Sequence, residues 1–309
     1  MHKYIIKRIL LLLPVILGVS FVVFTMLYMT PGDPARMALG EQASEEAVQK
    51  FREQEGLDDP FLVQYGRYLT KAVTKGDLGK SYATKRPVVS EILNVFPSTL
   101  KLTAFSMVIA VCLGIPFGII SAVRQYSKLD TAIMIVALIG ISMPVFWLGL
   151  LLILTFSVKL GWFPPSGFYS FKYMVLPSFA LSAQAVAIIT RMTRSSMLEV
   201  IRQDYIRTVR AKGQKESIVI GFHALKNALI PIITVIGVQF GYLLGGAILT
   251  EVIFSINGVG RLMVEAIKMR NYPIVQGGVL FIALAFSIVN LLVDLLYAYV
   301  DPRIKAQFK

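Results

Sequence analysis

Six runs of apolar residues, each close to the length of a bilayer-spanning helix, constrain what this 309-residue chain can fold into. They cover approximately residues 9–29, 98–122, 131–158, 174–190, 229–250 and 277–300. A helix needs about 20 mostly apolar residues to cross the hydrocarbon core of a bilayer. Charged residues make up only 16% of the chain, compared with about 25% in soluble domains. The sequence therefore predicts an all-α polytopic membrane protein with six transmembrane helices.

The first run follows Lys3, Lys7 and Arg8, as the core of a signal peptide would. It is longer than the usual core of about 7–15 residues, and no small-x-small cleavage site follows it. We expect a retained helix, followed by a stiff turn at "TPGDP" (30–34).

The distribution of lysine and arginine predicts the orientation, because cytoplasmic loops carry an excess of these residues. The two ends of the chain, the loop after the second run and the strip 191–226 together hold 16 basic and 5 acidic residues. The opposite side holds 15 basic and 12 acidic residues. We therefore expect both termini in the cytoplasm, and the net charge of +13 is explained by topology without nucleic-acid binding.

Residue patterns for catalysis or metal binding are missing from the sequence. The single Cys112 lies inside the second run, and His2 and His223 are far apart in sequence. "GDLGKS" (76–81) ends like a phosphate-binding loop but has Thr74 where that motif needs its first glycine. We expect neither an enzyme nor a bound metal or cofactor, so energy for any transport must come from an ion gradient or a partner.

The segment 30–97, between the first two runs, is long enough for a small extracytoplasmic helical insertion. We expect one helix from Glu45 to about Glu55, stopped by Gly56, and a second helix with Pro60 in its first turn. The second helix carries one face of mostly aromatic residues: Phe61, Tyr65, Tyr68, Leu69 and Ala72. This face could pack on the same chain as a lid or contact an external partner.

Small and polar residues within the runs suggest close packing and a pathway. Gly114 and Gly118, and then Gly237, Gly241 and Gly245, recur every four residues, a spacing that lets helices approach closely in lipid. They could pack within the chain or against a partner subunit.

Proline can kink or break the helices at Pro116, Pro144 and Pro177. Candidates for lining a pathway, equally able to bond between helices, are Ser142, Gln184, Gln239 and Gln276.

The strip from Asp204 to Pro231 predicts a helix ending at Gly213 and a second helix from Lys215 into the fifth run. We expect an elbow with its basic residues exposed and with Ile206, Val209, Ile218 and Phe222 available for packing. Such an elbow could dock a cytoplasmic protein. Alternatively, it is only a basic loop touching lipid headgroups.

The strip resembles the coupling loop of type I ABC importer permeases of the oligopeptide/dipeptide/nickel family. The family pattern is close to D-Y-[VI]-R-T-A-[RK]-A-K-G, a spacer, then H-A-L-[RK]-N-A-L-[LI]-P. Residues 204–213 read "DYIRTVRAKG" and residues 223–231 read "HALKNALIP", departing only at Val209. Further resemblance is carried by "TPGDP", "GLDDP", "FPSTLKLT" and "VDLLYAYVDPR". In "EVIFSINGVG" (251–260), Asn257 replaces the usual proline, and we expect Asn-Gly to keep the tight turn through left-handed backbone.

The resemblance implies a B-type permease subunit with residues 1–97 as the first helix and insertion, 98–300 as the type-1 transmembrane domain with a coupling loop at 197–228, and 301–309 as a cytoplasmic tail. It implies a prokaryotic cytoplasmic (inner) membrane location. Its partners would be a second homologous permease, two cytoplasmic ATPases that bind ATP and Mg, and an extracytoplasmic solute-binding protein. The residues implied at the ATPase contact are Arg207, Thr208, Arg210, Ala211, Lys212, Gly213, His223 and Asn227.

Peptides are the first substrate expected, with nickel complexes, glutathione and oligosaccharides as alternatives within the same family. An ion-coupled carrier would explain six spans, but only Asp294 lies deep inside one of them. A membrane scaffold would explain the elbow but not spans interrupted by glycine and proline.

Overall fold

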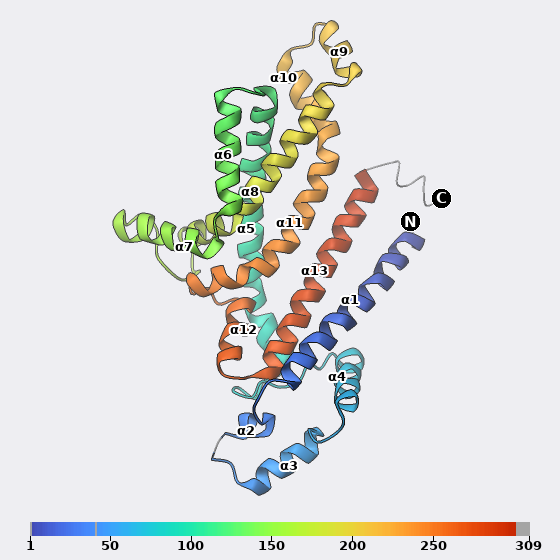
Figure 1. The fold of residues 1–309 in the computed structure, drawn as a ribbon, viewed down its shortest axis with the longest axis vertical. Helices are drawn as coiled ribbons and strands as arrows, with labels where there is room; N and C mark the ends of the chain where they lie inside the picture. Colours follow the sequence, from blue (N-terminus) through green and yellow to red (C-terminus); the bar gives the residue numbers. More distant parts are fainter. Residues whose placement is uncertain (1, 41, 301–309) are drawn as a thin grey trace. The chain divides into compact units, whose positions relative to one another are not determined.

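The computed structural model describes residues 2–40 and 42–300, and side chains within 10–40, 42–293 and 295. The tail predicted at 301–309 and the side chains of Lys3, Lys7, Arg8 and Asp294 lie outside these residues. The described part is helical, with one isolated bridge between Lys80 and Pro87. Its longest helices are α1 (His2–Tyr28), α5 (Val88–Val123), α8 (Phe171–Ile201), α11 (Leu225–Ile253) and α13 (Tyr272–Val300) (Figure 1).

Five helical segments are long and apolar enough to cross a membrane, and a bent pair raises the number to six. The pair joins α6 (Lys128–Ser142) to α7 (Val145–Leu152) and the π-helical η1 (Ile153–Lys159), with a bend of 106°. The sequence predicted one apolar run here and named Pro144 among three prolines that could break a helix, and the bend occurs at that proline.

The bend has a local cause at Met143 and Pro144. Proline lacks the backbone N–H that an α-helix needs, and it disfavours helical backbone at the preceding residue. Met143 is accordingly extended, with φ −81° and ψ 124°. Pro177, by contrast, lies within α8, which continues past it. Of these two prolines, only Pro144 ends a helix.

The chain divides into two compact units. The larger unit comprises Met1–Ile6, Leu100–Ile256 and Phe286–Lys309, and the smaller unit comprises Lys7–Thr99 and Asn257–Ala285. In the larger unit, α8 packs against α11, α6 and α7. Leu102 of α5, Ala185 and Ile189 of α8, and Leu243 of α11 are buried together in its core. α8 is therefore the central helix of this unit.

Glycines of α5 allow α5 to approach α8 closely. A Cβ added at Gly114 would lie 2.9 Å from the Cβ of Ile189. One added at Gly118 would lie 2.4 Å from the Cβ of Thr193. Real Cβ atoms do not tolerate such distances, so these two glycines pack within the chain.

Two of the three α11 glycines that recur every four residues have the same role. A Cβ at Gly237 would lie 2.8 Å from the Cβ of Val293, and one at Gly241 would lie 2.7 Å from the Phe286 ring. At Gly245 an added Cβ would meet nothing within 4 Å. Intramolecular packing therefore accounts for Gly237 and Gly241 but not for Gly245.

The smaller unit contains the helices predicted after the first span. They are α2 (Pro34–Leu39), α3 (Glu45–Glu55) and α4 (Phe61–Lys75). α3 ends at Gly56, whose φ is 63°, and Pro60 caps α4, so both predicted boundaries are confirmed.

The aromatic face of α4 packs on α1 of the same chain. The Tyr65 hydroxyl lies 2.8 Å from the hydroxyl of Ser20, and the ring of Phe61 contacts those of Phe21 and Phe24 edge-on. This face therefore packs within the chain, as the lid alternative supposed.

The turn after α11 differs from the one predicted at Asn257 and Gly258. Ser255 adopts the left-handed conformation, with φ 52°. Gly258 is extended and precedes α12 (Val259–Lys268), a helix of the smaller unit. The turn is thus made two residues before Asn257, and it does not use the left-handed tolerance of Asn-Gly.

Candidate functional site

The predicted elbow forms in the larger unit. α9 (Asp204–Ala211) follows α8 after a short break, and a second helical stretch begins at α10 (Glu216–Ile218) and continues through the π-helical η2 (Val219–Ala224) into α11. α9 and α10 lie at one end of the α8 and α11 pair (Figure 1). All eight residues from 211 to 218 are exposed, so the tip of the elbow has no cover from the described chain.

Gly213 makes the turn at the tip. Its φ is 76°, in the left-handed region that other residues rarely adopt. Its backbone N–H donates to the carbonyl of Arg210 at 2.9 Å and closes the end of α9. A Cβ added here would meet no atom of the chain within 4 Å. Backbone conformation, not crowding within this chain, accounts for the glycine.

Arg210 braces the two arms of the elbow across the turn. Its Nε and Nη2 donate to the Glu216 carboxylate at 3.1 and 2.6 Å. The hydrogen bond that Arg210 donates to Glu216 raises the pKa of Arg210 further above its already high ordinary value. Within α9, Thr208 donates back to the carbonyl of Asp204, and the mostly exposed Arg207 has only Asp204 near it, at 3.6 Å. Arg207, Ala211 and Lys212 therefore present exposed groups.

Tyr205 and Asn227 tie α9 to the start of α11. The Asn227 side-chain amide donates to the Tyr205 hydroxyl at 2.7 Å and to the carbonyl of His223 at 3.2 Å. His223 thus contributes its backbone, while its ring packs edge-on against Phe222. Tyr205 was not singled out from the sequence. The signal was present, because an aromatic hydroxyl in an otherwise charged helix needs a hydrogen-bond partner when it packs.

The elbow is anchored by Ile206, which is fully buried in a cluster with residues of α5, α8, η2 and α11. Ile218 and Phe222, which we expected to pack beside it, are instead 42% and 62% exposed. Their places are taken by Val219 and Ile220. Residues 219–224 are π-helical, so the face presented to the core departs from the α-helical period used for the prediction.

A buried ion pair fixes the turn between α5 and α6 onto α8. Asp130 is 4% exposed, and Arg194 donates to both of its carboxylate oxygens at 2.8 Å. The hydroxyl of Ser121 also donates to Asp130, and so does the backbone N–H of Tyr126. Fork-to-fork geometry of this kind is among the strongest in proteins. In the sequence, both charges were predicted only to mark the cytoplasmic side.

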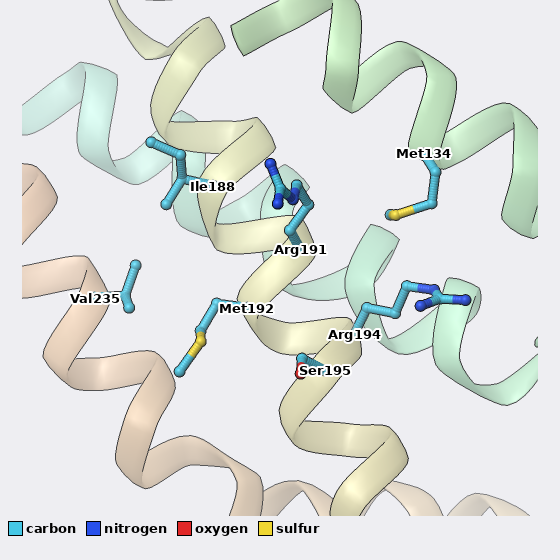
Figure 2. A pocket seen from close by; sticks show the side chains of 7 residues that line it. All are labelled: Met134, Ile188, Arg191, Met192, Arg194, Ser195 and Val235. Carbon is cyan, nitrogen blue, oxygen red and sulfur yellow. The ribbon is translucent and has the colours of Figure 1, made fainter.

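The four polar residues predicted to line a pathway lie on different elements, three in the larger unit and one in the smaller. Ser142 is exposed at the bend, Gln184 is half-buried on α8, and Gln239 is buried on α11. Gln276 belongs to the smaller unit, where it lines a cavity of about 390 Å³ with Tyr68 and Tyr82. A different hollow, of about 510 Å³, opens on α8 in the larger unit (Figure 2). Its lining residues are Met134, Ile188, Arg191, Met192, Arg194, Ser195 and Val235.

Two family models match the chain. Residues 114–306 match the inner membrane component of binding-protein-dependent transport systems, and residues 1–103 match the N-terminal part of such components. The chain belongs to this family. It is therefore an integral membrane permease subunit rather than an enzyme.

Relatives of known identity align along the whole chain. A dipeptide transport system permease of Alkalihalophilus pseudofirmus is 47% identical, over 99% of this chain and 100% of its own. A glutathione transport system permease of Escherichia coli K12 is 46% identical, over 99% of each chain.

Solved structures support the type I importer permease fold. A chain of the MetNI methionine ABC transporter, in an inward-facing conformation, superposes with a TM-score of 0.58. It is 18% identical, and the match covers 69% of this chain and 97% of that one. An amino acid ABC transporter gives a TM-score of 0.52 at 16% identity, over 70% and 94% of the two chains. At these identities the likeness concerns the fold alone.

Proposed function

We propose that this permease carries small peptides across the membrane in an importer driven by ATP on separate subunits. Identity of 47% and 46% with dipeptide and glutathione permeases over nearly their full lengths supports peptide-like solutes, glutathione included. A second, homologous permease would complete the pathway. A solute-binding protein would deliver the peptide on the side of α2 to α4, and both termini would lie in the cytoplasm.

The elbow is the feature that supports transport driven by a separate ATPase. It holds eight consecutive exposed residues on a turn braced by Arg210 and Glu216, at the end of two apolar spans. Ala211, Lys212 and Gly213 would enter a groove of an ATPase, with Arg207 and Thr208 beside them. Asn227 and the backbone of His223 would hold α9 in place. ATP and Mg would bind to the ATPases, and closure of the ATPase pair would move α9.

Co-purification tests this assembly. The tagged chain is extracted from its native membranes in mild detergent, and the proteins that accompany it are identified by mass spectrometry. We expect two ATPase subunits and a second polytopic permease. Recovery of the chain alone, or only with copies of itself, would contradict the proposal. The complete complex is then reconstituted with the binding protein and tested for ATP-dependent uptake of dipeptides, tripeptides and glutathione.

A further inference from the structure

The hollow on α8 lies on the side of that helix turned away from α5. Figure 2 shows Arg191 and Ser195 on α8, with α6 and α11 on either side. Gln184, Ile188, Arg191 and Ser195 follow at intervals of four, three and four residues, which places them on one helical face. Gly114 and Gly118 bring α5 against the opposite face of α8. This stripe is therefore a face of the central helix that the larger unit leaves uncovered.

Two arginines one turn apart on α8 have opposite surroundings. Arg194 is committed to Asp130 through two hydrogen bonds of 2.8 Å. Arg191 is exposed, and its guanidinium forms no ion pair or hydrogen bond with the residues that the structure describes. Residues 173–190, which precede it on the helix, contain no ionisable group except Tyr173. Arg191 is thus the first cation met along α8 from the apolar stretch.

An unpaired cation at the end of a membrane span requires a compensating group. Ionisable residues in spans characteristically face a protein interior or a water-filled cavity and mark a solute path. The hollow around Arg191 has no acidic lining residue, and its other lining side chains are apolar apart from Ser195 and the paired Arg194. The site therefore offers one free positive charge in apolar surroundings, which favours an anion.

We propose that Arg191 binds the carboxylate of the solute as it passes along the stripe on α8. This rests on the proposed function as a peptide permease. A planar guanidinium can donate two parallel hydrogen bonds to a carboxylate, a geometry that lysine cannot supply. Every unmodified peptide carries a C-terminal carboxylate whatever its side chains. A residue that reads this group alone accepts peptides of any sequence and disfavours solutes without an anion.

The test uses the complete importer in phosphatidylcholine vesicles, with the alanine dipeptide, the alanine tripeptide and glutathione as probes. In Arg191→Gln we expect ATP-dependent uptake to fall by about tenfold or more, the size of one lost hydrogen-bonded charge, with ATP hydrolysis retained. Arg191→Lys keeps the charge but cannot donate two parallel hydrogen bonds. We expect its uptake to lie between those of the wild type and Arg191→Gln. Lys128→Gln, which removes an exposed charge at the start of α6, outside the hollow, is the matched control and keeps normal uptake.

Chemical rescue separates charge from folding. Arg191→Cys is made in a Cys112→Ser background, and the folded complex is treated with an aminoethyl or a sulfonatoethyl thiosulfonate. We expect the cationic reagent to restore uptake and the anionic one to leave it low. Equal uptake in wild type and Arg191→Gln, or equal rescue by both reagents, would overturn the site.

A phosphate headgroup is the other anion that Arg191 could meet. If wild-type uptake rises with added phosphatidylglycerol and Arg191→Gln abolishes that dependence, the ligand is a lipid and the proposal is wrong. Failure of the wild-type complex to move any probe would instead contradict the proposed peptide function. The wild type therefore tests the function, and the variants test the site.

Discussion

The elbow and the segment 30–87 are both short helical insertions between spans, yet they are held in different ways. The segment 30–87 is tied by its own chain: Arg52 pairs with Asp33 at 3.0 Å, Arg67 pairs with Asp59, and Asn271 bonds to Ser81 at 2.8 Å. The elbow is anchored mainly by Ile206 and leaves residues 211–218 exposed. The first arrangement is held by several ion pairs and hydrogen bonds of its own chain, whereas the second leaves its tip exposed, as a docking surface would require.

The largest effect should come from Gly213→Arg at the exposed tip. A side chain at φ 76° is strained by about 1–3 kcal/mol, and this one would also occupy the proposed ATPase contact. We expect the variant to reach the membrane and lose ATP-dependent uptake. Gly161→Arg is the matched control, because Gly161 has φ 65° and open space around it but lies outside the elbow. Normal uptake in Gly213→Arg would contradict the docking role.

Arg194→Gln should cause the largest loss of stability, because it leaves Asp130 buried without its cation. Breaking a buried pair costs about 3–5 kcal/mol, and partial exposure of Arg194 favours the lower end. Denaturant unfolding in micelles measures the loss. The double variant Asp130→Asn/Arg194→Gln should recover part of it, since no buried charge is then left. Arg210→Gln, in the exposed pair with Glu216, should cost at most about 1 kcal/mol.

Ile206→Ala should loosen the elbow without unfolding the spans. Truncating a buried isoleucine costs about 2–5 kcal/mol, and here the loss is expected to fall mainly on the attachment of α9. Amide hydrogen exchange should therefore accelerate in 204–211 and stay slow in α8. Ile218→Ala, at a residue 42% exposed, should change little. Equal effects of the two substitutions would show that Ile206 is not the anchor.

Asn271→Ala tests the contacts of the segment 30–87 and should have the smallest effect of the four. It removes the acceptor of the Tyr82 backbone N–H and the donor to Ser81, at a cost of about 1–3 kcal/mol. Because other ties hold this region, we expect a lower melting temperature with uptake preserved. A loss of uptake at unchanged stability would instead give this region a direct part in transport.

Features that depend on local chemistry could be predicted from the sequence. Apolar runs gave the spans, Gly56 and Pro60 gave the limits of α3 and α4, and Gly213 gave the end of the first elbow arm. Features that depend on distant residues could not. Asp130 and Arg194 are 64 residues apart, and only the packing of α6 on α8 brings them together.

Two local features of the helices could not be predicted from the sequence for other reasons. The bend at Pro144 was one of three possible proline breaks, and nothing in the sequence ranked it first. The exposure of Ile218 and Phe222 follows from the π-helical stretch, which no residue pattern announced. Arg191 was visible as a charge, but only the folded chain shows that no described residue pairs with it.

α9 has a polar attachment through Tyr205 and Asn227 and one fully buried anchor, the side chain of Ile206. Force applied at the tip passes through that side chain to a cluster shared by α5, α8 and α11. Most of the tip takes no part in this cluster, so residues 211–218 can change, apart from the need for glycine at 213, without disturbing the core. The surface proposed to contact the ATPase is thereby separable from the buried cluster that holds α9 to the spans. Exchanging the tip between permeases of this family should redirect a transporter to another ATPase while its fold is preserved.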